Sequence, residues 1–318
     1  MLIYLLALLG ETCSRVQYTI SGMSSGGYMT GQVHVAYSSY ISGAGILVAG
    51  PYYCAQNSLV RANTICTYNN NPIDVTPLIN YTLSMAAQGL IDPVSYLSST
   101  TVYLFSGALD ELMQPAITQA TYNYYKAFIP ESKIFNVVDP YCNHAWPTKT
   151  SNKPCWYYGR YYINNCGYDG AGIMLTTLLG PLYQRNSFNQ SNLFPFPQKA
   201  YADVVKIHMD NYGYIYIPDN CKQDASICRL HVTLHGCGQS YQNVKLVYML
   251  GIGLLEWADS NDIVVIFPQT VNSKFSPGGC WDLDGYNGPD YALKTGGQVK
   301  AIHTMSQDYV GIVSNIFK

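Results

Sequence analysis

The feature that most constrains the fold lies near the start of the chain, where a strand-like run leads through a tight turn into a helix. Residues 16–21 (VQYTIS) have the β-rich composition of a strand, and residues 25–39 place apolar side chains along one side of a predicted helix. Between them, Gly22-Met23-Ser24-Ser25-Gly26 fits the pattern Gly-x-Ser-x-Gly. At a strand-to-helix turn, this pattern exposes a serine hydroxyl that can act as a nucleophile. Ser24 is therefore the first candidate catalytic residue.

The rest of the chain alternates strand-like runs with helix-like segments. We expect strands at residues 43–49, 102–106, 134–138, 212–217, 230–234 and 263–267, and helices near residues 116–128, 171–179, 244–259 and 297–317. This alternation favours an α/β fold, a mostly parallel sheet with helices on both faces. The runs at 212–217 and 230–234 predict an antiparallel hairpin at a sheet edge. The stretch 193–198 (LFPFPQ) is the one plausible seam, and a single domain is the simpler interpretation.

Composition excludes some classes of function. The chain has 318 residues, of which 48% are apolar and 11% charged, and its net charge is −2. It therefore lacks the basic surface that binds nucleic acid or anionic membranes. Thirty tyrosines among neutral polar residues suit neutral or polymeric substrates better than phosphorylated ones. The run GAGILVAG lacks the spacing of a nucleotide-binding loop, and we expect no cofactor and no metal.

The ten cysteines point to an oxidising compartment, because several form close pairs in loop-like sequence without zinc-type spacing. Residues 1–10 (MLIYLLALLG) form an apolar run of signal-peptide length that is too short to cross a bilayer. We expect a signal peptide or truncated leader at residues 1–12, a catalytic domain at 13–318, secretion and no membrane insertion. A buried first strand is the alternative for the leader. Asn80 and Asn189 begin glycosylation sequons.

A serine nucleophile needs a base and a third group that orients the base. His144 lies in a polar loop directly after the predicted strand 134–138, and Asp110 follows the strand 102–106. A sheet of this type presents catalytic groups at the carboxyl ends of its strands. Asp139 is the rival for the acid because it is closer to His144 in sequence. Adjacent strand ends usually supply acid and base from separate loops, so we favour Asp110.

Two backbone N–H groups must also face the oxyanion of the tetrahedral intermediate. Ser25, directly after the nucleophile, supplies one. The segment 231–240 (HVTLHGCGQS) has the sequence of the loop that supplies the second, through Cys237. In an α/β-hydrolase this loop normally precedes the nucleophile, so its late position predicts a circularly permuted α/β-hydrolase fold.

Taken in order, SGMSSGGYM, FSGALD, NHAWPT, NNCGYDGAG, LHGCGQS, FPQ and GGCWD resemble the circularly permuted fungal polyhydroxybutyrate depolymerases, from about residue 15 to the end. The resemblance implies a single α/β-hydrolase domain that cleaves short-chain hydroxyalkanoate polyesters. It implies Ser24, Asp110 and His144 as the triad, with Ser25 and Cys237 as the oxyanion hole. It also implies four disulfides: Cys54–Cys66, Cys155–Cys166, Cys221–Cys228 and Cys237–Cys280.

Departures from the family pattern concern the cysteines and the aromatic side chains. Cys13 and Cys142 are left over and could pair with each other. Leu283 stands where the family often has a second tryptophan. Trp281 could bind substrate or merely pack beside the disulfide, and Trp146 could line either the cleft or the core.

We therefore expect a secreted, monomeric serine esterase that hydrolyses poly(3-hydroxybutyrate)-like ester bonds through an acyl-enzyme. One alternative is a soluble carboxylesterase acting on acetyl, butyryl or feruloyl-type esters. Another is a hydrolase-like binding protein without turnover. The catalytic positions are all filled by chemically competent residues, which argues against the last alternative.

Overall fold

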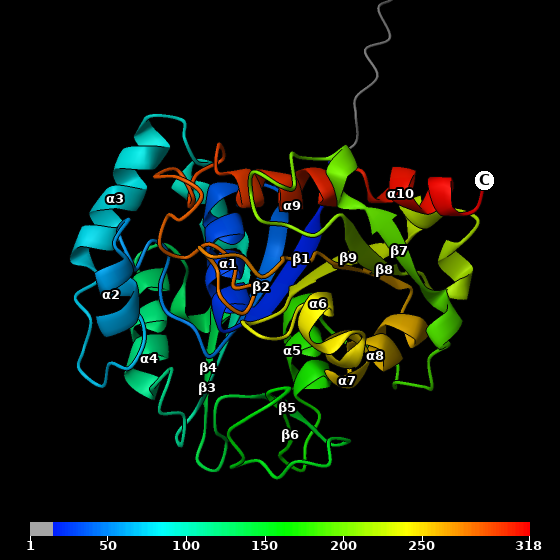
Figure 1. Cartoon of the computed structure of the whole chain (residues 1–318), viewed down its shortest axis with the longest axis horizontal. Coiled ribbons are helices and arrows are strands. Elements are labelled where there is room, and N and C mark those ends of the chain that lie inside the picture. Colours follow the sequence, from blue (N-terminus) through cyan, green and yellow to red (C-terminus); the bar gives the residue numbers. More distant parts are fainter. Residues whose placement is uncertain (1–14) are drawn as a thin grey trace, which may run out of the picture.

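The computed structural model describes residues 15–318 and places an eight-stranded, mostly parallel sheet at the centre of the molecule (Figure 1). The predicted leader at residues 1–12 and Cys13 lie outside the described residues. The sheet order is β4-β3-β2-β1-β9-β10-β8-β7. Its strands are β1 (Tyr18–Met23), β2 (Ile41–Leu47), β3 (Thr101–Gly107), β4 (Ile134–Asp139), β7 (Leu193–Pro197), β8 (Tyr212–Tyr216), β9 (Arg229–Leu234) and β10 (Ile263–Phe267).

Strand β1, which leads into the turn at Ser24, lies in the middle of the sheet. It pairs in parallel with β2 on one side and with β9 on the other. All six of its residues are buried, as expected for a central strand of a parallel sheet that is covered on both faces. The turn after β1 therefore opens at the middle of the carboxyl edge of the sheet.

Helices cover both faces of the sheet. They are α1 (Ser25–Ala36), α2 (Leu59–Thr64), α3 (Thr76–Ala87), α4 (Pro115–Tyr125), α5 (Gly170–Leu179), α6 (Tyr241–Val244), α7 (Val247–Gly251), α8 (Leu254–Ser260), α9 (Gly297–Gln307) and α10 (Tyr309–Ile316). In β2, a Cβ at Gly45 would meet Met174 of α5, whereas Ile46 lies 3.7 Å from where a Cβ at Gly31 of α1 would be. Successive strand residues point to opposite faces, so α1 and α5 lie on opposite sides of the sheet. Helices α4 and α9 pack on the side of α1, and α8 packs with α5.

The predicted hairpin is wrong. The segments 212–217 and 230–234 form β8 and β9, but these strands do not pair with each other. Strand β10 lies between them, antiparallel to β8 and parallel to β9. The loop between β8 and β9, closed by the Cys221–Cys228 disulfide, therefore carries the chain past β10 to the next position in the sheet.

The segment 193–198 is not a seam between domains. Its residues Leu193–Pro197 form β7, the edge strand, which pairs antiparallel to β8. Two prolines are compatible with this place because an edge strand leaves one row of backbone groups unpaired. The described chain therefore folds as one domain around a single main sheet.

Two predicted long helices are divided. The segment 244–259 forms α6, α7 and α8, with interruptions at Lys245 (φ 55°) and Gly253 (φ 80°), whose left-handed backbone cannot continue a helix. The segment 297–317 forms α9 and α10. No helix among residues 15–318 combines the length and apolar character that a membrane span requires.

All four disulfides implied by the resemblance are present: Cys54–Cys66, Cys155–Cys166, Cys221–Cys228 and Cys237–Cys280. The Cys155–Cys166 bridge lies in a small lobe built on the two-stranded sheet of β5 (Trp146–Thr148) and β6 (Ile163–Asn165), below the main sheet in Figure 1. This lobe begins directly after His144. The base candidate therefore lies where the lobe joins the main sheet.

Candidate active site

The backbone at Ser24 forms a sharp turn between β1 and α1. Ser24 has φ 56° and ψ −127°, a conformation that L-residues rarely adopt and that is typical of an exposed nucleophile. Both glycines of the motif are required by close backbone approach. A Cβ at Gly22 would lie 2.4 Å from the Gly26 carbonyl oxygen, and one at Gly26 would lie 2.3 Å from the Leu234 carbonyl oxygen. Larger residues would force the turn or β9 to move.

Asp110 and His144 meet at the carboxyl ends of β3 and β4. His144 Nδ1 lies 2.7 Å from Asp110 Oδ2, and both side chains are almost completely buried. Asp110 Oδ1 accepts hydrogen bonds from the N–H groups of Leu112 (2.9 Å) and Met113 (2.8 Å). The carboxylate is thereby fixed in the position from which it can orient the ring and stabilise an imidazolium.

The rival acid has different partners. Asp139 Oδ1 accepts from the N–H groups of Tyr141 (2.8 Å) and Cys142 (3.0 Å), and its Oδ2 accepts from the Tyr168 hydroxyl (2.5 Å). Asp139 thus shapes the turn that leads to His144, whereas Asp110 contacts the His144 ring itself. The geometry favours Asp110 as the acid.

The predicted oxyanion loop, residues 231–240, lies against Ser24. A Cβ at Gly236 would be only 3.1 Å from Ser24 Cβ, and the next residue, Cys237, lines the same cavity as Ser24 and Ser25. The first N–H groups of a helix have no intrahelical acceptor, so those at the start of α1 are free to bind an anion. The Cys237–Cys280 disulfide and a 2.7 Å hydrogen bond from Gly238 N to Gly278 O hold the loop to the GGCWD segment.

The site opens into a cavity of about 280 Å³. It is lined by Ser24, Ser25, Leu59, Ala62, Asn63, Thr67, Tyr68, Leu112, Met113, His144, Tyr162, Cys237, Phe275, Ser276, Pro277, Cys280, Trp281, Leu283, Asp284 and Tyr286. Ser24 and His144 both face it, without a hydrogen bond between them in this structure. Such bonds are often long in ligand-free enzymes and tighten with substrate.

The aromatic candidates have different environments. Trp281 is fully buried, lies with its ring centroid 5.4 Å from that of His235, and forms part of the cavity wall. Trp146 is also fully buried and packs edge-on against Tyr248, so it belongs to the core. Leu283 lines the cavity.

Sequence reasoning missed Tyr162. Its ring lies edge-on to His144, with the centroids 5.6 Å apart, and it forms part of the cavity wall. Its backbone is in the left-handed region, at φ 48°. A tyrosine in a chain of 30 tyrosines carries no local signal of such a role.

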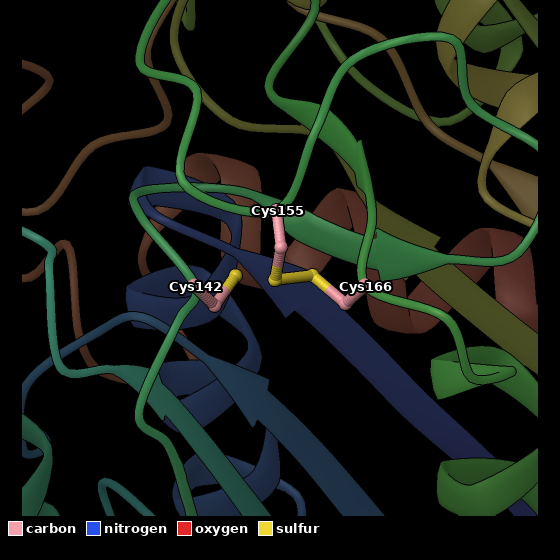
Figure 2. Close-up of side chains that lie close together, drawn as sticks. All are labelled: Cys142, Cys155 and Cys166. Carbon is pink, nitrogen blue, oxygen red and sulfur yellow. A yellow bond between two sulfur atoms is a disulfide. The ribbon is translucent and has the colours of Figure 1, made fainter.

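Cys142 lies close to one of the disulfides. Figure 2 shows its side chain beside the Cys155–Cys166 bridge, and the three sulfur atoms lie within 4.8 Å of one another. Within residues 15–318, these cysteines are the only His, Cys, Asp or Glu cluster with the spacing of a metal site, but two of the sulfurs are joined to each other. Cys142 is the one described cysteine outside a disulfide, and burial raises the pKa of its thiol.

Three other histidines pack away from the cavity. His34 is fully buried between the Tyr125 hydroxyl (2.9 Å) and Thr100 Oγ1 (3.1 Å). His231 is buried between Thr19 Oγ1 and Ser21 Oγ, each at 2.8 Å. His303 stacks on Tyr37, with the ring centroids 3.7 Å apart. None of these rings lines the cavity.

A parallel α/β sheet, a serine on a strained turn at a helix start and a buried Asp–His pair define an α/β-hydrolase-like serine hydrolase. A scan against models of protein families gives no match. Two curated proteins are similar over most of this chain. A poly(3-hydroxybutyrate) depolymerase of Delftia acidovorans is 38% identical over 295 residues, which are 92% of this chain and 59% of that protein. A polyhydroxybutyrate depolymerase of Talaromyces funiculosus is 33% identical over 300 residues, which are 89% of this chain and 86% of that protein.

Solved structures agree with these relatives. A serine-to-alanine variant of a PHB depolymerase complexed with an R3HB trimer has a TM-score of 0.86 and 30% identity, over 94% of this chain and 97% of that chain. A PHB depolymerase from Penicillium funiculosum has a TM-score of 0.84 at the same identity and coverage. The chain belongs to the polyhydroxybutyrate depolymerase family, as the sequence resemblance predicted. It spans only about three fifths of the length of the Delftia relative.

Proposed function

We propose that the protein hydrolyses ester bonds of poly(3-hydroxybutyrate)-like polyesters through an acyl-enzyme on Ser24. His144 removes the Ser24 proton, and the alkoxide attacks the ester carbonyl. The N–H groups of Ser25 and Cys237 stabilise the oxyanion of the tetrahedral intermediate. His144 then protonates the departing alcohol and activates the water that releases the acid, while Asp110 stabilises the imidazolium.

One observation carries this proposal: the buried His144–Asp110 pair, at 2.7 Å, faces the same cavity as a serine on a strained turn. The close approach of Gly236 to Ser24 supports the assignment of the second oxyanion N–H to the next residue, Cys237. The family relationship adds the reaction, since the relatives from Delftia acidovorans and Talaromyces funiculosus are both named as depolymerases of this polyester.

The test is hydrolysis of p-nitrophenyl butyrate and clearing of poly(3-hydroxybutyrate) granules by the wild type, Ser24→Ala and Ser187→Ala. Ser187 is exposed and does not line the cavity, so its variant is the matched control. We expect both activities in the wild type and the control and neither in folded Ser24→Ala. Hydrolysis by Ser24→Ala at the wild-type rate would exclude this nucleophile.

Exposed side chains at the mouth of the cavity support a polymeric substrate. Leu59, Tyr68 and Phe275 line the cavity and are also 65%, 65% and 54% exposed. An apolar rim of this kind can contact neighbouring units of a polyester chain, which a small ester would not reach.

A soluble carboxylesterase is the second candidate, favoured by Leu283 at a cavity position where a larger aromatic would contact more of a polymer. Release of hydroxybutyrate from granules separates the two candidates. A protein that turns over p-nitrophenyl butyrate but releases no hydroxybutyrate from granules would be the carboxylesterase.

We also infer a permuted order of the motifs. Strand β9, which carries the oxyanion loop, lies directly beside β1 although it follows it by about two hundred residues. Helix α9 packs on α1, and Gln307 donates a 3.0 Å hydrogen bond to the Val16 carbonyl, which precedes β1. A variant opened between residues 186 and 187, with residues 318 and 15 joined by a flexible linker, should fold and hydrolyse p-nitrophenyl butyrate. An insoluble or unfolded product would contradict this inference.

Secretion and a monomeric state complete the proposal. Four disulfides are typical of proteins that fold in an oxidising compartment. The proposed catalytic groups all come from one chain, so no second copy is needed to build the site. Activity in the culture medium and a monomeric mass by light scattering are the expected results. Retention inside the producing cell or a stable dimer would contradict them.

A further inference from the structure

The cavity beside Ser24 contains one carboxylate that the proposed mechanism does not use. Asp284 lies two residues after the GGCWD segment and lines the cavity next to Leu283. It is the only Asp, Glu, Lys or Arg among the described residues that line this space. Among the ionisable groups of the cavity wall, the proposed mechanism uses His144.

The position of Asp284 is fixed by a buried neighbour. Asp282 is 1% exposed, and its Oδ1 accepts hydrogen bonds from the N–H groups of Asp284 (3.2 Å) and Gly285 (2.7 Å). Its Oδ2 accepts from Asn287 N at 2.8 Å. These bonds close the loop into a compact turn and fix the backbone that carries the Asp284 side chain.

The Asp284 carboxylate forms no ion pair with a Lys, Arg or His side chain among residues 15–318. Its Oδ1 is shielded from solvent and has no hydrogen-bond partner among residues 15–318. Burial raises the pKa of Asp284, because the ionised form gives up hydration, and backbone N–H groups at Tyr286 and Asp284 offset only part of this shift. A charge that is neither paired nor fully hydrated acts on other charges more strongly than one on the open surface.

We propose that Asp284 is a specificity-determining residue that excludes esters with a free carboxylate from the cavity. The inference rests on the proposed polyester hydrolysis. Interior units and hydroxyl ends of a polyester are neutral, whereas acid ends and acid products carry a negative charge. Two unit charges roughly 10 Å apart, at an effective dielectric constant of about 20, weaken binding roughly tenfold. The same repulsion assists release of each newly formed acid.

The test compares two forms of the (R)-3-hydroxybutyrate trimer, the free acid and its methyl ester. The quantity measured is the ratio of kcat/KM for the methyl ester to kcat/KM for the acid, within each variant, so that a change in overall turnover cancels. The variants are Asp284→Asn and Asp262→Asn. Asp262 is exposed, precedes β10 at the opposite edge of the sheet, and its left-handed backbone accepts asparagine, so its variant removes the same charge elsewhere.

We expect a ratio of about ten in the wild type and in Asp262→Asn, and a ratio near one in Asp284→Asn. Raising the salt concentration should lower the ratio in the wild type but not in Asp284→Asn, which a merely structural role would not produce. An unchanged ratio in Asp284→Asn, with turnover of the methyl ester retained, would overturn the inference and leave the proposed function standing. A wild type that hydrolyses neither form would overturn both.

Discussion

Mild acid should destabilise this protein because several histidines are buried as neutral rings. Burial lowers the pKa of His34 and His231 to about 3 and that of His235 to about 4. All three are fully buried. His235 Nδ1 lies 2.8 Å from the Gly236 carbonyl and its Nε2 accepts from Thr270 N at 3.3 Å, the pattern of a neutral ring. As the pH falls, these histidines are therefore protonated in the unfolded chain at a higher pH than in the folded protein.

The size of the effect follows from the pKa difference between the folded and unfolded states. An unfolded histidine has a pKa of about 6.5. The stability that each neutral buried ring contributes is therefore fully present above that pH, and it is lost as the pH falls toward the pKa of the ring in the folded protein. Between pH 7 and pH 5 each ring costs about 2 kcal/mol of unfolding free energy, and three cost about 6 kcal/mol. Asp282, whose pKa burial raises to about 6, offsets about 1 kcal/mol because it gains its proton in the folded state.

The assay is urea unfolding at pH 7 and pH 5 for the wild type, His231→Gln and Ser21→Ala. His231→Gln should lose about 2 kcal/mol less than the wild type between the two pH values, although it is less stable at pH 7. Ser21→Ala removes a hydrogen-bond partner of the same ring but keeps the ring, so it should retain the wild-type pH dependence. Equal pH dependence in the wild type and His231→Gln would refute the reasoning.

Three further predictions concern the frame of the site. Gly26→Ala should lower stability by about 1–3 kcal/mol and reduce esterase activity, because its Cβ would lie 2.3 Å from the Leu234 carbonyl; an unchanged Tm would contradict this. Cys280→Ser removes the disulfide between two residues 43 apart and should lower the free energy of unfolding by about 4 kcal/mol through loop entropy. It should also reduce kcat more than Cys221→Ser does, and equal kcat in the two variants would contradict a role of the disulfide in holding the oxyanion loop. Cys142 should resist iodoacetamide at pH 8 until the protein is unfolded, and rapid labelling of the native protein would contradict its burial.

Much of the site could be predicted because its signals are local. Gly-x-Ser-x-Gly encodes much of its own turn, since Gly22 is required by the close approach of the Gly26 backbone, whereas Gly26 is required by a contact with Leu234 of β9. Asp110 and His144 follow strands whose composition is clear, and a parallel sheet brings its strand ends to one edge. The four disulfides came from the family resemblance, because spacing alone leaves many pairings open.

The errors concern contacts between segments far apart in the chain. No feature within 212–234 reveals that β10 would insert between β8 and β9, because strand order depends on all neighbours together. The interruption at Lys245 depends on a left-handed residue that is not glycine, which sequence does not signal. Asp284 and Tyr162 reach the cavity through irregular loops whose course no periodicity predicts.

The central claim is that Ser24 is the nucleophile activated by His144. Incubation with dilute diethyl p-nitrophenyl phosphate, followed by peptide mass spectrometry, tests it most directly. We predict one adduct, on Ser24, that forms as esterase activity disappears and that does not form in His144→Ala. An adduct on another residue that tracks the loss of activity, or an active protein left unlabelled at Ser24, would contradict the account.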